Sequence, residues 1–143
     1  MDDPTTPAVE LLVHVSSLTM TSLEESAAQV GLSVQQLRLL GILRDREPTM
    51  GELTGHLGLD KSSVSGLVIR AERRGLVTRV QHERDGRAVR VRLEPSGRAL
   101  IDEATSRFGA DFARVFAALT PGELAEWMAL TARLVAVQRD AGD

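Results

Sequence analysis

Basic side chains gather in one stretch of this chain, residues 61–98. That stretch holds ten Lys and Arg against four Asp and Glu, a net charge of +6, although the whole chain carries −3. Positive charge collected on part of an acidic protein suits the binding of a polyanion, while the remaining negative charge keeps the molecule soluble. The alternative is an ordinary solvated surface. We favour a polyanion site because the excess falls on neighbouring predicted elements.

Other chemistry is limited by what the chain lacks. It has no cysteine, which excludes disulfides, thiolate metal ligands and a thiol nucleophile. Its histidines, His14, His56 and His82, are too dispersed for a metal motif, and no phosphate-binding glycine loop occurs. No segment approaches the roughly 20 apolar residues of a membrane span, and MDDPTTP lacks a signal-like apolar core. We therefore expect a cytoplasmic protein that is not an enzyme and uses no cofactor or metal.

Helix starts are marked by side chains that can cap the free N–H groups of a first turn. Capping boxes are predicted at Ser33–Gln36, Thr49–Glu52 and Thr120–Glu123, with Asp60 as a further cap. The predicted helices cover about Pro7–Ala28, Val34 to before Pro48, Met50–Leu57, Lys61–Arg74, a long helix from Pro95 and Gly97 to Leu119, and Thr120–Arg139. The first helix is expected to be amphipathic, with one apolar face formed by Val9, Leu12, Ser16, Met20 and Leu23.

After Gly75 the apolar period changes from helical to alternating. Leu76, Thr78 and Val80 form one predicted strand face, Val89, Val91 and Leu93 the next, and Asp85-Gly86 the turn between them. Two short helices followed by a hairpin predict a mainly α protein with a small β-wing, a winged helix-turn-helix. We expect one domain over residues 1–143, with the winged helix at about 33–95 and dimerisation helices at about 5–30 and 96–140.

The second helix of such a pair lies in the DNA major groove, with its N-terminal residues near the base edges. At helical spacing Val64, Leu67, Val68 and Ala71 share the buried side, and Ser62, Ser65, Gly66, Ile69 and Arg73 lie broadly opposite. Serine hydroxyls pair with several base edges, so Ser62, Ser63 and Ser65 are candidate readers of modest discrimination. Alternatively, these serines serve only to start the helix.

The hairpin offers a second DNA contact. Arg84 and Arg87 near its tip suit the negative potential of the minor groove, and Arg90 and Arg92 share the strand side opposite Val91 and suit phosphates. Exposed arginines on an edge strand also discourage aggregation, which is an alternative explanation for Arg79 and Arg92. The predicted DNA-binding residues are Lys61, Ser62, Ser63, Ser65, Gly66, Arg70, Arg73, Arg84, Arg87 and Arg90.

The segments DKSSVSGLVIRAERRGLVTRV and ERDGRAVRVRLEPSG resemble the recognition helix and wing of the multiple antibiotic resistance regulator (MarR) family. The family's wing pattern is matched at Asp85, Arg87, Val91, Leu93 and Gly97, and the likeness covers nearly the whole chain. It implies a dimeric winged-helix transcription factor in which Arg87 enters the minor groove and Asp85 holds the wing through an ion pair.

Three positions depart from that family pattern. Glu94 replaces a threonine, which weakens the expected cap of the long helix. Gly66 stands where many members carry an arginine, which removes a possible bidentate contact with guanine. Ile69 stands where many members have aspartate; we expect it to pack beneath the wing, with contact to a thymine methyl as the alternative.

The ends of the chain are rich in apolar residues. Phe108, Phe112 and Phe116 lie four residues apart, and Leu124, Trp127, Met128 and Leu134 continue an apolar face on the last helix. Such a face suits a two-fold interface, although an intramolecular core is the alternative. The resemblance also implies a small-molecule pocket near the dimer helices, for which His14 is a candidate ligand contact against a purely structural role.

These features lead to one main hypothesis and one alternative. The main hypothesis is a homodimeric, sequence-specific repressor that binds double-stranded DNA at a pseudo-palindromic operator and is released by a small ligand. The alternative is a winged-helix docking module that binds proteins and no longer binds DNA, which is suggested by Gly66.

Overall fold

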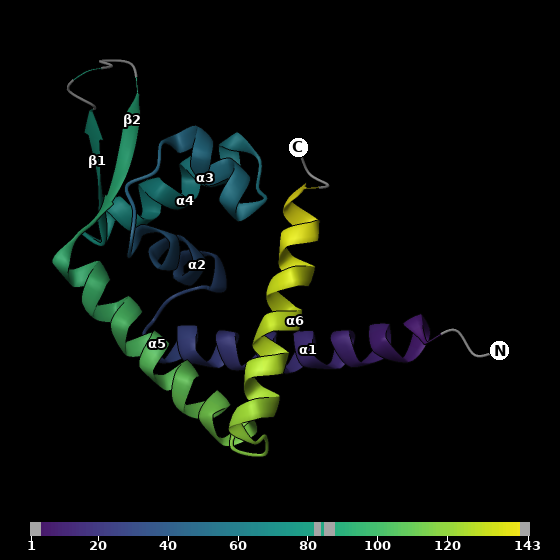
Figure 1. Ribbon diagram of the computed structural model, residues 1–143. Coiled ribbons are helices and arrows are strands. Elements are labelled where there is room, and N and C mark those ends of the chain that lie inside the picture. The colour runs from purple at the N-terminus through teal and green to yellow at the C-terminus, as the bar shows by residue number, and fades with distance from the viewer. Residues whose placement is uncertain (1–3, 82–83, 85–87, 141–143) are drawn as a thin grey trace. The chain divides into compact units, whose positions relative to one another are not determined.

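The computed structural model describes residues 4–81, 84 and 88–140, and its elements follow the predicted order (Figure 1). They are α1 (Thr5–Gln29), α2 (Val34–Leu43), α3 (Met50–Leu57), α4 (Lys61–Arg73), β1 (Val77–Gln81), β2 (Val89–Leu93), α5 (Pro95–Phe116) and α6 (Pro121–Asp140). The predicted fold class, mainly helical with a small antiparallel wing, is confirmed. The chain divides into two compact units, Met1–Phe108 and Gly109–Asp143. No helix in the described part of the chain is both long and apolar enough to span a bilayer.

Side-chain caps begin several helices, as the sequence predicts. Ser33 Oγ accepts a hydrogen bond from the Gln36 N–H at 3.1 Å, and Gln36 Oε1 accepts one from the Ser33 N–H at 3.0 Å. Each box satisfies two N–H groups that the helix itself leaves unpaired. The other reciprocal pairs are Thr49–Glu52 and Thr120–Glu123.

The core of the first unit lies among α2, α3, α4 and the base of the wing. Five of its fully buried side chains come from the helices, namely Leu39, Leu40, Leu53, Val64 and Val68. The turn between α3 and α4 contains Gly58, whose φ of 65° is the left-handed conformation that glycine adopts without strain. This turn allows α4 to pack back on α3 and α2 and so fixes which side of α4 faces outward.

The C-terminus of α4 is closed by a Schellman motif. The Gly75 N–H binds the Glu72 carbonyl at 2.9 Å, and the Leu76 N–H binds the Ala71 carbonyl at 3.0 Å. Gly75 has φ of 71°, so the predicted helix stop at this residue is confirmed. Leu76 is buried as the apolar residue that follows the cap, and it belongs to this turn rather than to the wing.

The wing strands pair antiparallel, but the predicted phase of the first strand is wrong. Val77 is buried, and it pairs with Leu93, while Arg79 pairs with Val91. Directly paired residues of an antiparallel sheet project to the same face, so the core face of β1 begins at Val77 and not at Thr78. Burial of Leu76 by the helix cap makes the alternating pattern begin one residue too early.

Backbone pairing joins strand β2 of the wing to the segment between α2 and α3. The Val91 N–H binds the Pro48 carbonyl at 2.9 Å, and Thr49 forms an isolated antiparallel bridge with Arg90. Thr49 therefore has two roles, because it also caps α3. This backbone pairing fixes β2 against the segment between α2 and α3.

The start of α5 packs closely on the turn after α4. The Glu94 N–H binds the Leu76 carbonyl at 2.9 Å, and Ser96 Oγ donates to the Gly75 carbonyl at 2.6 Å. Gly97 is buried, and a Cβ at this position would collide with the Leu76 carbonyl. The helix begins at Pro95 despite Glu94 in place of the family's threonine, since these contacts hold its first turn.

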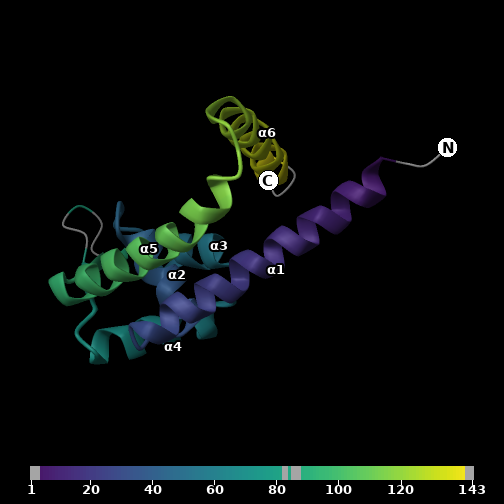
Figure 2. The same cartoon turned by 90° about the horizontal axis from the view of Figure 1, so that it is seen from below.

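The N-terminal half of α1 extends beyond α2, α3 and α4 (Figure 2). The expected single apolar face is wrong, because exposed apolar residues lie on several sides of this half; they are Val9, Leu11, Leu12, Val13, Val15, Leu18 and Met20. Only Ser26 and Ala27, near the C-terminal end of α1, are buried in the protomer. Period-based reasoning assumes one buried face, and this segment buries none.

The second unit contains the end of α5 and all of α6. The Phe116 ring lies 6.2 Å from the Phe112 ring and 4.9 Å from the Trp127 ring, centroid to centroid. Edge-on and tilted pairs at these distances are favourable. Nevertheless, Trp127 is 41% exposed and Leu134 is 67% exposed. Within this unit, no residue of α6 with a described side chain is buried.

Candidate nucleic-acid interface

One side of α4 is buried and the other faces outward, as the sequence predicts. The buried residues are Val64, Leu67, Val68 and Ala71. Lys61, Ser62 and Ser63 are exposed at the N-terminal end, and Ser65 and Gly66 are half-buried in the next turn. Arg70 and Arg73 are exposed further along the helix. The structure therefore brings the seven α4 residues of the predicted site onto the part of the helix that is not packed in the core.

Asp60 organises the front of this surface. Its carboxylate accepts hydrogen bonds from the Ser62 hydroxyl at 2.6 Å, the Ser63 hydroxyl at 2.7 Å and the Ser63 N–H at 2.9 Å. These hydrogen bonds hold the pKa of Asp60 well below its usual range, and the bond from the Ser62 hydroxyl contributes most. Ser62 and Ser63 thus do help to start the helix. Each hydroxyl still has acceptor lone pairs, so the DNA contact remains a prediction for both.

The described part of the wing places Arg84 at an exposed position beyond β1. Arg87 and Asp85, the predicted minor-groove arginine and its ion-pair partner, lie outside the described residues, as does Gly86 of the predicted turn. Strands β1 and β2 rise beside α3 and α4 (Figure 1). The wing's contribution to DNA binding therefore remains a prediction.

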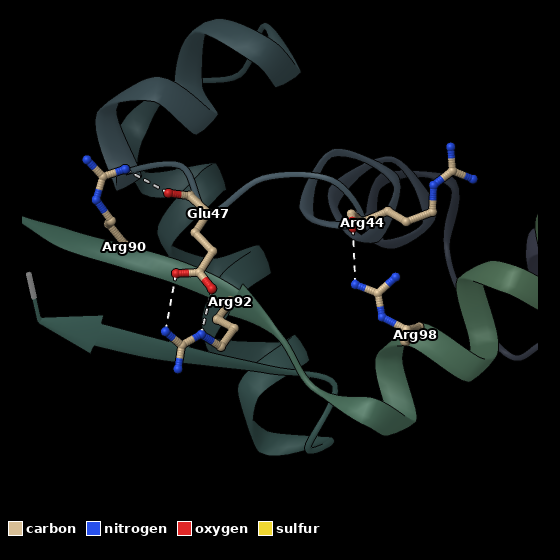
Figure 3. A network of polar contacts seen from close by, with 5 residues as sticks. All are labelled: Arg44, Glu47, Arg90, Arg92 and Arg98. Atoms are coloured by element: carbon tan, nitrogen blue, oxygen red, sulfur yellow. Dashed lines mark hydrogen bonds and ion pairs between the residues drawn. The ribbon is translucent and has the colours of Figure 1, made fainter.

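Glu47 holds two wing arginines, as Figure 3 shows. The Arg92 guanidinium donates to Glu47 Oε1 at 2.7 Å and to Oε2 at 3.3 Å, and Arg90 Nη1 donates to the Glu47 carbonyl at 2.8 Å. The Arg92 hydrogen bonds lower the pKa of Glu47, and Glu47 raises the pKa of Arg92 in return. Arg90 is half-buried, and its Nε has no hydrogen-bond partner in the described structure. Arg90 therefore has a structural contact in addition to its predicted phosphate contact.

Sequence reasoning did not single out Glu47. Its partners are 43 and 45 residues away in the chain, so no local spacing indicates the pairing. The available signal was its position directly before Pro48, in the segment that pairs with β2. A carboxylate beside the wing can set the orientation of β2 relative to α3.

Arg79 also has a structural partner. Its Nε and Nη2 donate to Glu72 Oε2 on α4 at 3.1 and 2.9 Å. These hydrogen bonds lower the pKa of Glu72. The ion pair connects β1 to α4, so Arg79 does more than protect a strand edge.

A cleft of about 370 Å³ lies where the end of α2 meets β2 and α5. It is lined by Leu43, Arg44, Asp45, Arg46, Glu47, Arg92, Leu93 and Arg98. Arg98 Nη2 donates to the Arg44 carbonyl at 3.1 Å, which connects α5 to the end of α2 (Figure 3). The cleft does not include His14, which is exposed on α1. Across the described ranges, no three His, Asp or Glu side chains form a group able to hold a metal ion.

The fold and part of the sequence are similar to those of known proteins. A sequence model of the MarR family matches residues 30–88. No curated protein is detectably similar to the chain. Among solved structures, a MarR family protein from Bacillus stearothermophilus is 27% identical with a TM-score of 0.86, covering 97% of this chain and 99% of its own.

Two further solved structures extend this likeness. A MarR family transcriptional regulator from Silicibacter pomeroyi is 27% identical with a TM-score of 0.77, covering 90% of this chain and 88% of its own. CouR from Rhodococcus jostii RHA1, solved with p-coumaroyl-CoA bound, is 27% identical with a TM-score of 0.74, covering 88% of this chain and 89% of its own. The matched sequence includes α4 and the start of the wing, and the similar structures include all the elements around them. Residues 30–88 therefore match the MarR family, and the chain is similar in fold to winged helix-turn-helix transcription regulators of that family.

Proposed function

We propose that this protein is a homodimeric repressor that binds double-stranded DNA at a near-palindromic operator. The observation that carries the proposal is the outward side of α4, where Lys61, three serines and two arginines lie opposite a buried apolar side. Small polar side chains at the front of a recognition helix permit close approach to base edges, and the basic residues supply phosphate contacts. Such a regulator acts in the cytoplasm, where it has access to DNA.

Dimerisation is supported by the apolar residues that the protomer leaves exposed. They occur along α1 and along α6, and large exposed apolar surfaces in water-soluble proteins mark interfaces. A two-fold dimer presents two recognition helices about 34–36 Å apart, one turn of DNA, which is the reason to expect an inverted repeat.

Release by a small molecule is the remaining part of the proposal. CouR binds p-coumaroyl-CoA, and it shares the fold and 27% of its sequence with this chain. A ligand that binds the DNA-free form more tightly than the DNA-bound form shifts the population away from the operator. His14 remains a candidate ligand contact, because it is an ionisable residue among apolar neighbours on α1.

The test is selection of bound sequences from a random duplex library, followed by affinity measurements on the selected and scrambled duplexes. We expect an inverted repeat with half-sites about 10 base pairs apart and an affinity for it at least about 1,000-fold above that for scrambled duplex. Affinity should fall steeply between about 50 and 200 mM salt, because each phosphate contact releases a counterion. A protein-docking module would show neither sequence enrichment nor this salt dependence.

Lys61→Ala tests the contribution of α4 to DNA binding, and Arg87→Ala tests that of the wing. Lys61→Ala should weaken binding to all duplexes alike and reduce the salt slope by about 1, as expected for one phosphate contact. Arg87→Ala should lower duplex affinity if the wing enters the minor groove, whereas a docking module would lose none. Arg133→Ala on α6 removes the same charge outside the winged helix and should change neither quantity.

A further inference from the structure

Gly66 stands in the middle of α4 although the backbone there does not require glycine. The glycines with positive φ in the described structure are Gly31, Gly58 and Gly75, and Gly66 is not among them. Glycine in a helix interior is less favourable than alanine, because it loses more backbone freedom on folding. The recognition helix therefore carries a stability cost at its centre, on its outward side.

The space above Gly66 is occupied by Arg70. A Cβ on Gly66 would lie 3.1 Å from Arg70 Nη1 and 4.0 Å from Arg70 Cζ, and apart from the chain neighbours and backbone of its own helix no other described atom lies within 4 Å. Side chains of an α-helix lean toward its N-terminus, so a residue covers the turn before its own Cα. The Arg70 guanidinium consequently lies one turn nearer the front of α4 than its position in the sequence suggests.

Arg70 also differs from most arginines near it in having an unpaired guanidinium. Arg74 donates to the Gly31 carbonyl, Arg79 to Glu72, and Arg92 to Glu47. Within the part of the chain that the structure describes, the Arg70 guanidinium has no hydrogen bond or ion pair, and the residue is exposed. Its donors are available for a ligand that approaches the front of α4.

From these observations we propose that Gly66 and Arg70 act as one specificity-determining unit, in which the glycine leaves the space that lets the Arg70 guanidinium read a guanine. A guanidinium placed in the major groove can donate two parallel hydrogen bonds to guanine O6 and N7, the most frequent specific arginine contact with DNA. The serines at the front of α4 pair with several bases, so Arg70 supplies the sharper discrimination. This inference rests on the proposed DNA binding.

The experiment selects bound sequences from a random duplex library with the wild-type protein, Arg70→Ala, Gly66→Ala and the double variant. The wild-type motif should contain one G·C pair in each half-site whose replacement lowers affinity roughly 10- to 100-fold. Arg70→Ala should lose the preference at that pair and keep the rest of the motif. Gly66→Ala should lose part of it, because the added methyl displaces Nη1.

The double variant separates two reasons for a glycine at position 66. If the glycine makes room for Arg70, adding Gly66→Ala to Arg70→Ala changes nothing further. If the glycine instead lets the helix approach DNA closely, Gly66→Ala lowers affinity even without Arg70, and the proposal is wrong. An Arg70→Ala motif identical to that of the wild type also overturns it.

Arg73→Ala is the matched control, because Arg73 is a second exposed arginine on α4. It should weaken binding to all duplexes by a similar factor and leave the motif intact. Thermal unfolding excludes a folding defect, and Gly66→Ala should be at least as stable as the wild type. If the wild-type protein itself enriches no sequence, the proposed function fails together with this inference. If the wild type enriches a motif and Arg70→Ala enriches the same one, only this inference fails.

Discussion

Individual arginines of the winged helix fall into two groups that look alike in the sequence. Arg74, Arg79 and Arg92 hold the domain together through a carbonyl or a carboxylate. Arg70 and Arg73 are exposed and have no such contact within the described residues. Only arginines of the second group have all their donors available for DNA. A count of positive charge therefore overstates the number of residues that can contact phosphates or bases.

Glu47→Gln tests the structural role of the ion pair at residue scale. Hydrogen bonds from Arg92 lower the pKa of Glu47 below its ordinary value of 4.5. A group with a lowered pKa contributes stability that is fully present above about pH 4.5 and is lost as the pH falls through its lowered value in the folded protein. We expect Glu47→Gln to be less stable than the wild type at pH 6, and the difference to shrink by pH 3.

Urea unfolding at several pH values between 3 and 6 measures this effect. Glu126→Gln on α6 makes the same change at an exposed position and should show little difference at any pH. A wild-type advantage over Glu47→Gln that stays constant across the whole range would contradict the assignment.

At the scale of elements, the first turn of α5 closes the winged helix. Gly97 packs against the turn after α4, with the Leu76 carbonyl and Leu93 Cδ1 next to the position that a Cβ would take. Backbone cannot move away as a flexible side chain can. The glycine that matched the family's wing pattern is therefore required for packing, and its role differs from that of Gly66 on the recognition helix.

Gly97→Ala should destabilise the protein by about 1–3 kcal/mol, because the methyl group forces the start of α5 away from the turn. Gly109→Ala is the matched control in the same helix, since its added Cβ would meet no described atom within 4 Å beyond its chain neighbours and the backbone of α5. The control should be neutral or stabilising by up to about 1 kcal/mol through better helix propensity. Chemical denaturation of both variants measures the difference, and equal effects would show that the contact at Gly97 is unimportant.

At the scale of the whole molecule, each of the two units leaves large apolar residues exposed, on α1 in the first unit and on α6 in the second. Leu11 is 65% exposed and Leu134 is 67% exposed, and each has further exposed apolar neighbours on its helix. Such surfaces are the reason to expect a second copy of the chain. In the proposed dimer, two α4 helices would bind DNA more tightly than one alone, since the second binding event would be intramolecular.

Leu134→Glu should raise the dimer dissociation constant at least about tenfold, because it places a charge in a surface expected to be buried on assembly. Sedimentation equilibrium measures the oligomeric state, and operator affinity should fall in parallel. His56→Glu at an exposed position of α3 introduces the same charge outside the predicted dimerisation helices and should leave the dimer intact. A Leu134→Glu variant that remains as dimeric as the wild type would contradict this use of α6.

Much of the fold was predictable because its signals are local. The caps at Ser33, Thr49 and Asp60 and the stop at Gly75 fix helix bounds through contacts within a few residues. The buried side of α4 followed from helical periodicity. The phase of β1 did not follow, because burial of Leu76 by the helix cap imitates a strand residue.

The sequence by itself determined the order of the elements, the outward side of the recognition helix and the excess of positive charge, since each depends on residue type and on spacing within one element. Only the tertiary structure decided which arginine side chains form intramolecular hydrogen bonds or ion pairs, that Glu47 holds the wing, and that Arg70 lies over Gly66. The contacts of Arg74 with Gly31 and of Arg92 with Glu47 join residues more than 40 positions apart in the chain. The contact of Arg70 with Gly66 depends on the conformation of a flexible side chain. Periodicity and composition carry no information about either, because both arise from how the folded surfaces meet.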